Sequence, residues 1–127
     1  MKNTNLRELI DDYINAYNDF DIEGMIASLH SGIVFKNFSN GEINLITNGI
    51  SEFRAQAEIA VTYFTERRQT ITSIQINGLK AEVAIKYAAI LATDLPNGMK
   101  AGDSLEIEGT SIFYFEDGLI SSIEDYS

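Results

Sequence analysis

The stretch TSIFYFEDGLISSIEDY (residues 110–126) predicts two β-strands joined by a tight turn. Apolar and polar residues alternate on both sides of Asp117-Gly118, and an Asp-Gly pair in that setting is a strong hairpin signal. Further upstream, the same alternation predicts strands over residues 70–77, 81–93 and 103–116, with turns at residues 77–78 and 94–98. Four consecutive strands joined by short turns predict an antiparallel meander.

The first half of the chain is predicted to be mainly helical. The expected elements are helices over residues 6–20, 22–29 and 50–66, and strands over residues 33–38 and 42–47. Asn5 and Asp21 are suitable N-caps for the first two helices, and Asn40-Gly41 is a typical hairpin turn. The 127 residues are therefore expected to form one α+β domain spanning residues 1–127.

Composition argues against several classes of partner and cofactor. The chain has a formal net charge of −10 and no cysteine, so disulfides and thiolate chemistry are excluded. Nucleic acids and anionic membranes attract basic surfaces, and neither is expected as a partner. The only basic pair, Arg67-Arg68, is expected at the end of the third helix, where it complements the helix dipole. His30 is expected in a loop after the second helix, and no metal or other cofactor is predicted. The start of the chain does not resemble an export signal, and a cytoplasmic protein is expected.

Two segments carry a resemblance to a known family. YINAYNDFDIEGMIASL (residues 13–29) and TSIFYFEDGLISSIEDY (residues 110–126) resemble the nuclear transport factor 2-like superfamily, within its SnoaL-like and ketosteroid isomerase-like branch. The resemblance implies a cone-shaped, curved antiparallel sheet packed against three helices, with a pocket between them. Many members of the superfamily form dimers through the sheet.

The resemblance also implies where chemistry would occur. In the isomerase pattern a tyrosine on the first helix donates to the substrate, and Tyr13 stands there. The general base is an aspartate near the end of the first strand, where this chain has Asn37, and the second donor is an aspartic acid where it has Ser111. An amide has no basic form near neutral pH, so steroid isomerisation is not expected.

Asp125 is a possible replacement base. If Ile123 points into the core, alternation carries Asp125 to the same face, where a buried carboxylate would have a raised pKa and could accept a proton. Ile120 and Tyr126 favour the opposite orientation, which would leave Asp125 at a solvated rim. If Asp125 faces the pocket, it would be the base and Tyr13 the hydrogen-bond donor of a cyclase, isomerase or lyase that needs no cofactor.

The leading hypothesis is a domain that binds a small apolar compound bearing a carbonyl or hydroxyl group. The residues predicted to contact such a ligand are Tyr13, Tyr17, Phe35, Asn37, Phe53, Tyr87, Ser111 and Phe113. A second hypothesis is the enzyme just described, and a third is a non-catalytic dimeric interaction module. The two long strands also carry apolar residues on their other face, which predicts a homodimer burying Ala88, Ile90, Ile112 and Tyr114.

Overall fold

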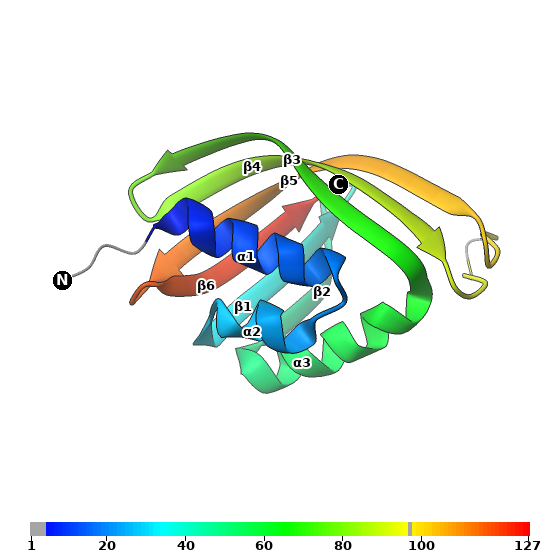
Figure 1. Cartoon of the computed structure of the whole chain (residues 1–127), viewed down its shortest axis with the longest axis horizontal. Coiled ribbons are helices and arrows are strands. Elements are labelled where there is room, and N and C mark those ends of the chain that lie inside the picture. The colour runs from blue at the N-terminus through cyan, green and yellow to red at the C-terminus, as the bar shows by residue number, and fades with distance from the viewer. Residues whose placement is uncertain (1–4, 97) are drawn as a thin grey trace.

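A computed structural model describes residues 5–96 and 98–127, so part of the predicted turn at residues 94–98 and the first four residues lie outside the described chain. The helices are α1 (Leu6–Asn18), α2 (Ile22–Ala27), α3 (Gly49–Ala60) and the 3-10 turn η1 (Val61–Tyr63). The strands are β1 (Leu29–Ser39), β2 (Glu42–Asn48), β3 (Phe64–Asn77), β4 (Lys80–Leu91), β5 (Ser104–Glu116) and β6 (Leu119–Tyr126). They form one curved sheet in the order β2-β1-β6-β5-β4-β3 (Figure 1).

The predicted α+β fold is confirmed, including its meander. Strands β3 to β6 pair antiparallel in chain order, and the Asn40-Gly41 and Asp117-Gly118 turns both have positive φ angles. Two consecutive residues with positive φ give the backbone twist that suits a two-residue hairpin.

The sheet is mixed rather than wholly antiparallel as expected. Strand β1 pairs with β6 in parallel, which brings Phe35 opposite Ile123 and Asn37 opposite Asp125. Parallel neighbours need a long connection, and here the connection contains every element from β2 to β5. Alternation within a strand carries no information about such a distant partner.

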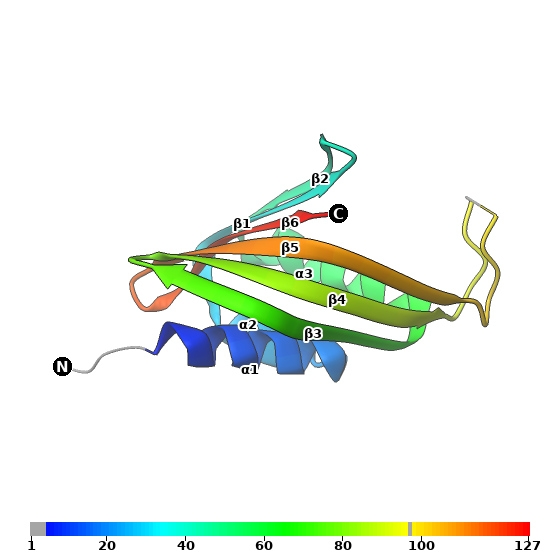
Figure 2. The same ribbon diagram turned by 90° about the horizontal axis from the view of Figure 1, so that it is seen from above.

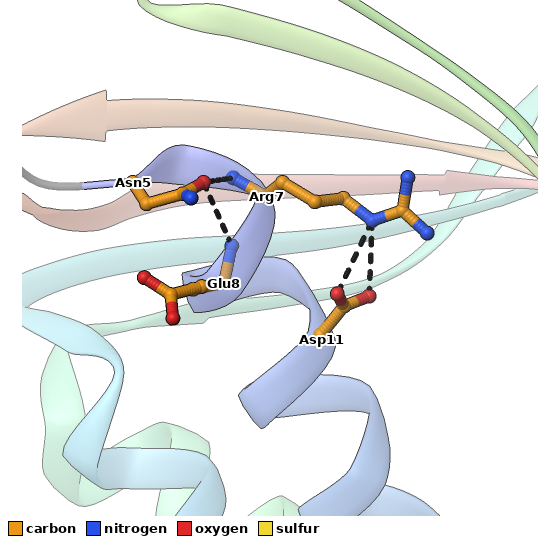
Figure 3. Close-up of polar contacts among 4 residues, drawn as sticks. All are labelled: Asn5, Arg7, Glu8 and Asp11. Atoms are coloured by element: carbon orange, nitrogen blue, oxygen red, sulfur yellow. Dashed lines mark hydrogen bonds and ion pairs between the residues drawn. The ribbon is translucent and has the colours of Figure 1, made fainter.

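Helix α1 crosses the concave face of the sheet, as both views show (Figures 1 and 2). Helix α3 packs beside β1 and β2, and it lies beneath α1 in the view of Figure 1. The Asn5 side chain accepts hydrogen bonds from the backbone N–H groups of Arg7 and Glu8, as expected for an N-cap (Figure 3). One turn further on, Arg7 pairs with Asp11. The Asp21 side chain accepts from the Gly24 N–H and begins α2.

The predicted end of the third helix is wrong. Residues 50–66 keep a helical spacing of apolar side chains, but α3 ends at Ala60 and β3 begins at Phe64. The run from Val61 to Thr65 is β-branched or aromatic, and such residues favour a strand. Arg67-Arg68 consequently lies in the middle of a strand, with Arg67 buried and Arg68 exposed on the other face.

The predicted place of His30 is also wrong. Helix α2 ends at Ala27, so His30 is the second residue of β1 instead of a loop residue.

Helices α2 and α3 are joined by an ion pair, in which the Arg54 guanidinium of α3 binds both carboxylate oxygens of Glu23 on α2. The ion pair joins two helices that the sequence gives no reason to place side by side.

The core lies between α1, α3 and the concave face, and Val83, Ile85, Phe113 and Phe115 from β4 and β5 are buried in it. The convex face of β4 and β5 has Ala88 exposed and Ile90, Ile112 and Tyr114 half-buried. Exposed charged residues of the same strands lie on this face, namely Lys80, Glu82, Lys86, Glu106 and Glu108. The second face is therefore less apolar than the sequence pattern indicated.

Candidate functional site

A cavity of about 430 Å³ opens between the concave face of the sheet, α1 and α3. Its apolar walls include Met25, Phe35, Leu45, Phe53, Ala57, Phe64 and Ile85. Its polar lining includes Tyr13, Tyr17, Asn37, Thr47, Gln56, Arg67, Gln69, Tyr87, Ser111 and Asp125. A half-open, mostly apolar cavity with a few convergent polar groups is the usual form of a small-molecule site.

Asp125 faces this cavity, which answers the question that alternation left open. Ile123, two residues earlier on the same face, is fully buried. Ser111 lies opposite Asp125 on β5, and its hydroxyl donates to the Asp125 carboxylate over 2.6 Å. Burial raises the pKa of Asp125 to about 6, although the hydrogen bond from Ser111 opposes the shift.

Tyr13 extends from α1 into the same cavity. Its ring packs edge-on against Phe113 and at a tilt against Phe53, and these contacts fix its position. Burial raises the pKa of Tyr13 well above its usual value, and the charge of Asp125 raises it further. The hydroxyl therefore stays protonated and can donate a hydrogen bond close to the Asp125 carboxylate.

Asn37 stands beside Asp125 in the register between β1 and β6. Its Nδ2 donates to Asn44 Oδ1 on β2 over 2.9 Å, so its partner is a side chain and not loop backbone. Asn37 lines the cavity, and no described residue donates to its side-chain oxygen. Asn37 can therefore accept a hydrogen bond from a ligand, but it cannot serve as a base.

Tyr17 and Tyr87 line another part of the cavity, where their hydroxyls share a hydrogen bond of 3.0 Å. Burial raises the pKa of both groups. Two hydroxyls that share one hydrogen bond keep one further proton to donate. The pair can thus offer a ligand both an acceptor and a donor.

Seven of the eight residues predicted to contact a ligand line the cavity. Phe113 does not; it is fully buried behind Tyr13 and supports it from the core. The sequence interpretation missed Arg67, Thr47 and the glutamines at 56 and 69. For Arg67, the β-branched and aromatic run just before it was the signal that could have placed it in a strand.

His30 lies outside the cavity, near Glu116 and Asp117 at the β5–β6 turn. Their possible metal-binding atoms fall within 4.8 Å of one another. His30 Nδ1 accepts from the Gly32 N–H, and Nε2 lies 3.4 Å from the exposed Asp117 carboxylate. The contacts of His30 with Gly32 and Asp117 account for this arrangement, and among the described residues no other such group of three occurs.

Several solved structures share this fold. A provisionally assigned polyketide cyclase from Xanthomonas campestris pv. campestris is 18% identical, with a TM-score of 0.82 over 95% of this chain and 88% of that one. A hypothetical protein with a ketosteroid isomerase-like fold from Catenulispora acidiphila, in complex with trimethylamine, is 12% identical, with a TM-score of 0.79 over 94% and 85%. A provisionally assigned SnoaL-like polyketide cyclase from Jannaschia sp. CCS1 is 11% identical, with a TM-score of 0.79 over 94% and 82%.

At these identities the similarity shows that the proteins share a fold. It does not show that they share a reaction or a ligand. No curated protein sequence matches this chain. Within the described part of the chain, no helix is both long and apolar enough to cross a membrane. The sequence model of the SnoaL-like domain, however, matches residues 10–123, nearly the whole length. The chain belongs to the SnoaL-like domain family.

Proposed function

We propose that this domain binds a small, mainly apolar compound bearing one or two oxygen atoms in the cavity between α1, α3 and the sheet. The observation that carries the proposal is the combination of aromatic walls with polar tips that face the same space. Tyr13 and the Tyr17–Tyr87 pair can donate to a ligand oxygen, and Asn37 can accept from a ligand hydroxyl. The Catenulispora relative, crystallised in complex with trimethylamine, is consistent with a small-molecule role for this fold.

Binding can be tested with 2-acetylnaphthalene, a planar ketone that suits a cavity of about 430 Å³. In ¹H–¹⁵N spectra, the ketone should shift the amide signals of Asn37, Gln56 and Ser111. The signals of Glu82 and Glu108, on the convex face, serve as the internal control and should not move. Shifts confined to the convex face, or no shifts at millimolar ketone, would refute binding in the cavity.

The position of Asp125 favours a second candidate function, proton-transfer catalysis. With a pKa of about 6, its carboxylate is mostly ionised at neutral pH yet more basic than an ordinary aspartate. It would take a proton from a carbon next to the ligand carbonyl, and the electron pair of the broken C–H bond would form an enolate. The Tyr13 hydroxyl would donate to the enolate oxygen.

Two outcomes are open to such an enolate. Asp125 can return the proton to a different carbon, which is an isomerisation. Alternatively, the enolate carbon can attack a second carbonyl, which closes a ring and forms an alkoxide that takes the proton back from Asp125. Ser111 would hold the carboxylate in place during either reaction, because its hydroxyl donates to Asp125 over 2.6 Å. The provisional assignments of the Xanthomonas and Jannaschia relatives as polyketide cyclases agree with the second outcome.

Deuterium exchange separates catalysis from binding. In D₂O, the protein should speed the loss of methyl protons from 2-acetylnaphthalene, and Asp125→Asn should remove about 100-fold or more of that rate. Asp12→Asn, an exposed change on α1, is the matched control and should leave the rate unchanged. Binding without exchange would keep the first proposal and reject the second.

We also infer a homodimer through the convex face of β4 and β5, with Ala88, Ile90, Ile112 and Tyr114 at its centre. The half-buried apolar side chains on this face support the dimer. The charged residues between them reduce the apolar surface that a dimer could bury. A dimer would leave the cavity accessible, because the cavity opens on the concave side.

A further inference from the structure

The cavity contains a buried cation without a counter-ion. Arg67 lines it from β3 and is only 5% exposed. Within residues 5–96 and 98–127, no carboxylate forms an ion pair with Arg67. Arginine stays ionised in proteins, so the cavity wall carries a full positive charge at every physiological pH.

Few of the donors of this guanidinium are used. Nε donates to the backbone oxygen of Tyr17 over 2.9 Å, near the carboxyl end of α1. Among the described residues nothing accepts from either terminal nitrogen, and Nη2 is fully buried. Buried donors without partners are uncommon in folded proteins and call for an explanation.

A purely structural role explains only part of this arrangement. The guanidinium lies 3.7 Å from the centre of the Tyr17 ring and 4.6 Å from that of Phe20, so it links α1 to β3 by cation–π contacts. The end of a helix also attracts positive charge. Neither contact uses the terminal nitrogens, whose forked geometry matches the two oxygens of a carboxylate.

The opposite charge is in another part of the cavity. Asp125 and Arg67 both act on the hydroxyls of Tyr13 and Tyr17, where Asp125 raises the pKa and Arg67 lowers it. The pKa of Asp125 itself reflects burial and Ser111 alone. The sheet register separates the two charges. Asp125 pairs with Ser111, which pairs with Val83 on β4, whereas Arg67 pairs with Ala89 near the other end of β4.

We propose that the ligand of this cavity is an organic acid whose carboxylate pairs with the guanidinium of Arg67. The Tyr17–Tyr87 pair, at the same part of the cavity, has one proton left to donate to that carboxylate. The apolar body of the ligand lies against Phe35 and Phe53, and its second oxygen lies towards Tyr13 and Asp125. This inference rests on the proposed binding function and narrows its ligand to one class of compound.

The overall charge of the protein makes the inference easy to test. A chain with a net charge of −10 repels anions at long range, so it should favour a neutral ligand over an anionic one of the same shape. A preference for the anion would therefore have to come from a local cation. Arg67 and Arg68 are neighbours on one strand and point to opposite faces, which provides a matched pair of variants.

The probes are 2-naphthoate and 2-naphthamide, which have nearly the same shape and differ in charge. Titrated at pH 7.5 by calorimetry, the wild-type protein should bind the carboxylate about tenfold or more tightly than the amide. Arg67→Met should reduce this ratio to about threefold or less, and Arg68→Met should preserve it. Arg67→Lys, which keeps the charge but not the fork, should give an intermediate ratio.

Each other outcome has a definite meaning. Equal binding of both probes by the wild-type protein would overturn the inference and leave the binding function standing. A carboxylate preference that survives Arg67→Met would also overturn it. Failure of both probes to bind at millimolar concentration would reject the binding function, and the inference with it. If Arg67→Met does not fold, which melting followed by circular dichroism would reveal, Arg67→Lys replaces it, and a ratio equal to that of the wild-type protein would overturn the inference.

Discussion

Replacing Asp125 by asparagine should stabilise the folded protein at neutral pH. Burial raises the pKa of Asp125 from 3.8 to about 6, so the folded state keeps a proton that the unfolded chain releases between about pH 4 and pH 6. The folded state thus binds more protons in that interval, and the free energy of unfolding falls as the pH rises through it. One pKa unit corresponds to about 1.4 kcal/mol, so the shift of about two units costs about 3 kcal/mol above pH 6.

Asparagine keeps the size of the side chain and can still accept from Ser111, but it has no charge to bury. The variant should therefore gain about 2–3 kcal/mol over the wild-type protein at pH 7.5 and almost nothing at pH 4. Urea unfolding followed by far-ultraviolet circular dichroism gives both free energies. Asp12→Asn, at an exposed position, is the control for removing one negative charge from an acidic protein.

The decisive quantity is the difference between variant and wild type as the pH changes, because other carboxylates titrate equally in both proteins. If the two stability curves run parallel from pH 4 to pH 7.5, Asp125 is not a buried carboxylate and cannot be a tuned base. If they diverge as expected, the protein retains a group that lowers its own stability. Natural proteins keep such groups mainly where function requires them.

Three further predictions concern the fold and assembly. Asn5→Ala removes the side-chain acceptor at the start of α1 and should lower the free energy of unfolding by about 1 kcal/mol in urea denaturation. Phe53→Ala, which removes a buried ring in contact with Tyr13 and Phe35, should cost about 3–4 kcal/mol in the same assay. Tyr114→Glu places a charge at the centre of the inferred dimer face and should halve the mass measured by light scattering. An unchanged mass would reject that face.

The local elements were predictable because their signals are local. Asn5, Asp21 and the two hairpin turns depend on hydrogen bonds and φ angles within a few residues, and each is found where the sequence placed it. The concave face of β4 and β5 was also predictable, since alternation alone decides which side chains share a face.

Two parts of the prediction failed, namely the end of the third helix and the pairing of β1. Nothing in the spacing of Phe64 distinguishes the last turn of a helix from the first residue of a strand, and that ambiguity concealed Arg67. The parallel pairing of β1 with β6 was equally out of reach, because it joins residues from opposite halves of the chain. This pairing also determines which residues meet in the cavity, since it places Asn37 beside Asp125.

The parallel pairing of β1 with β6 is expected to form late when the protein folds. The meander from β3 to β6 closes only short loops and can form early. Strand β1 must instead pair with β6 across most of the chain. That step is slow because the entropy of closing a long loop is lost before any contact forms. The wall that carries Asn37 and Asp125 is therefore expected to be the last part of the protein to assemble. A compound that binds both Asn37 on β1 and Asp125 on β6 would hold the two strands together and slow the unfolding of the whole domain.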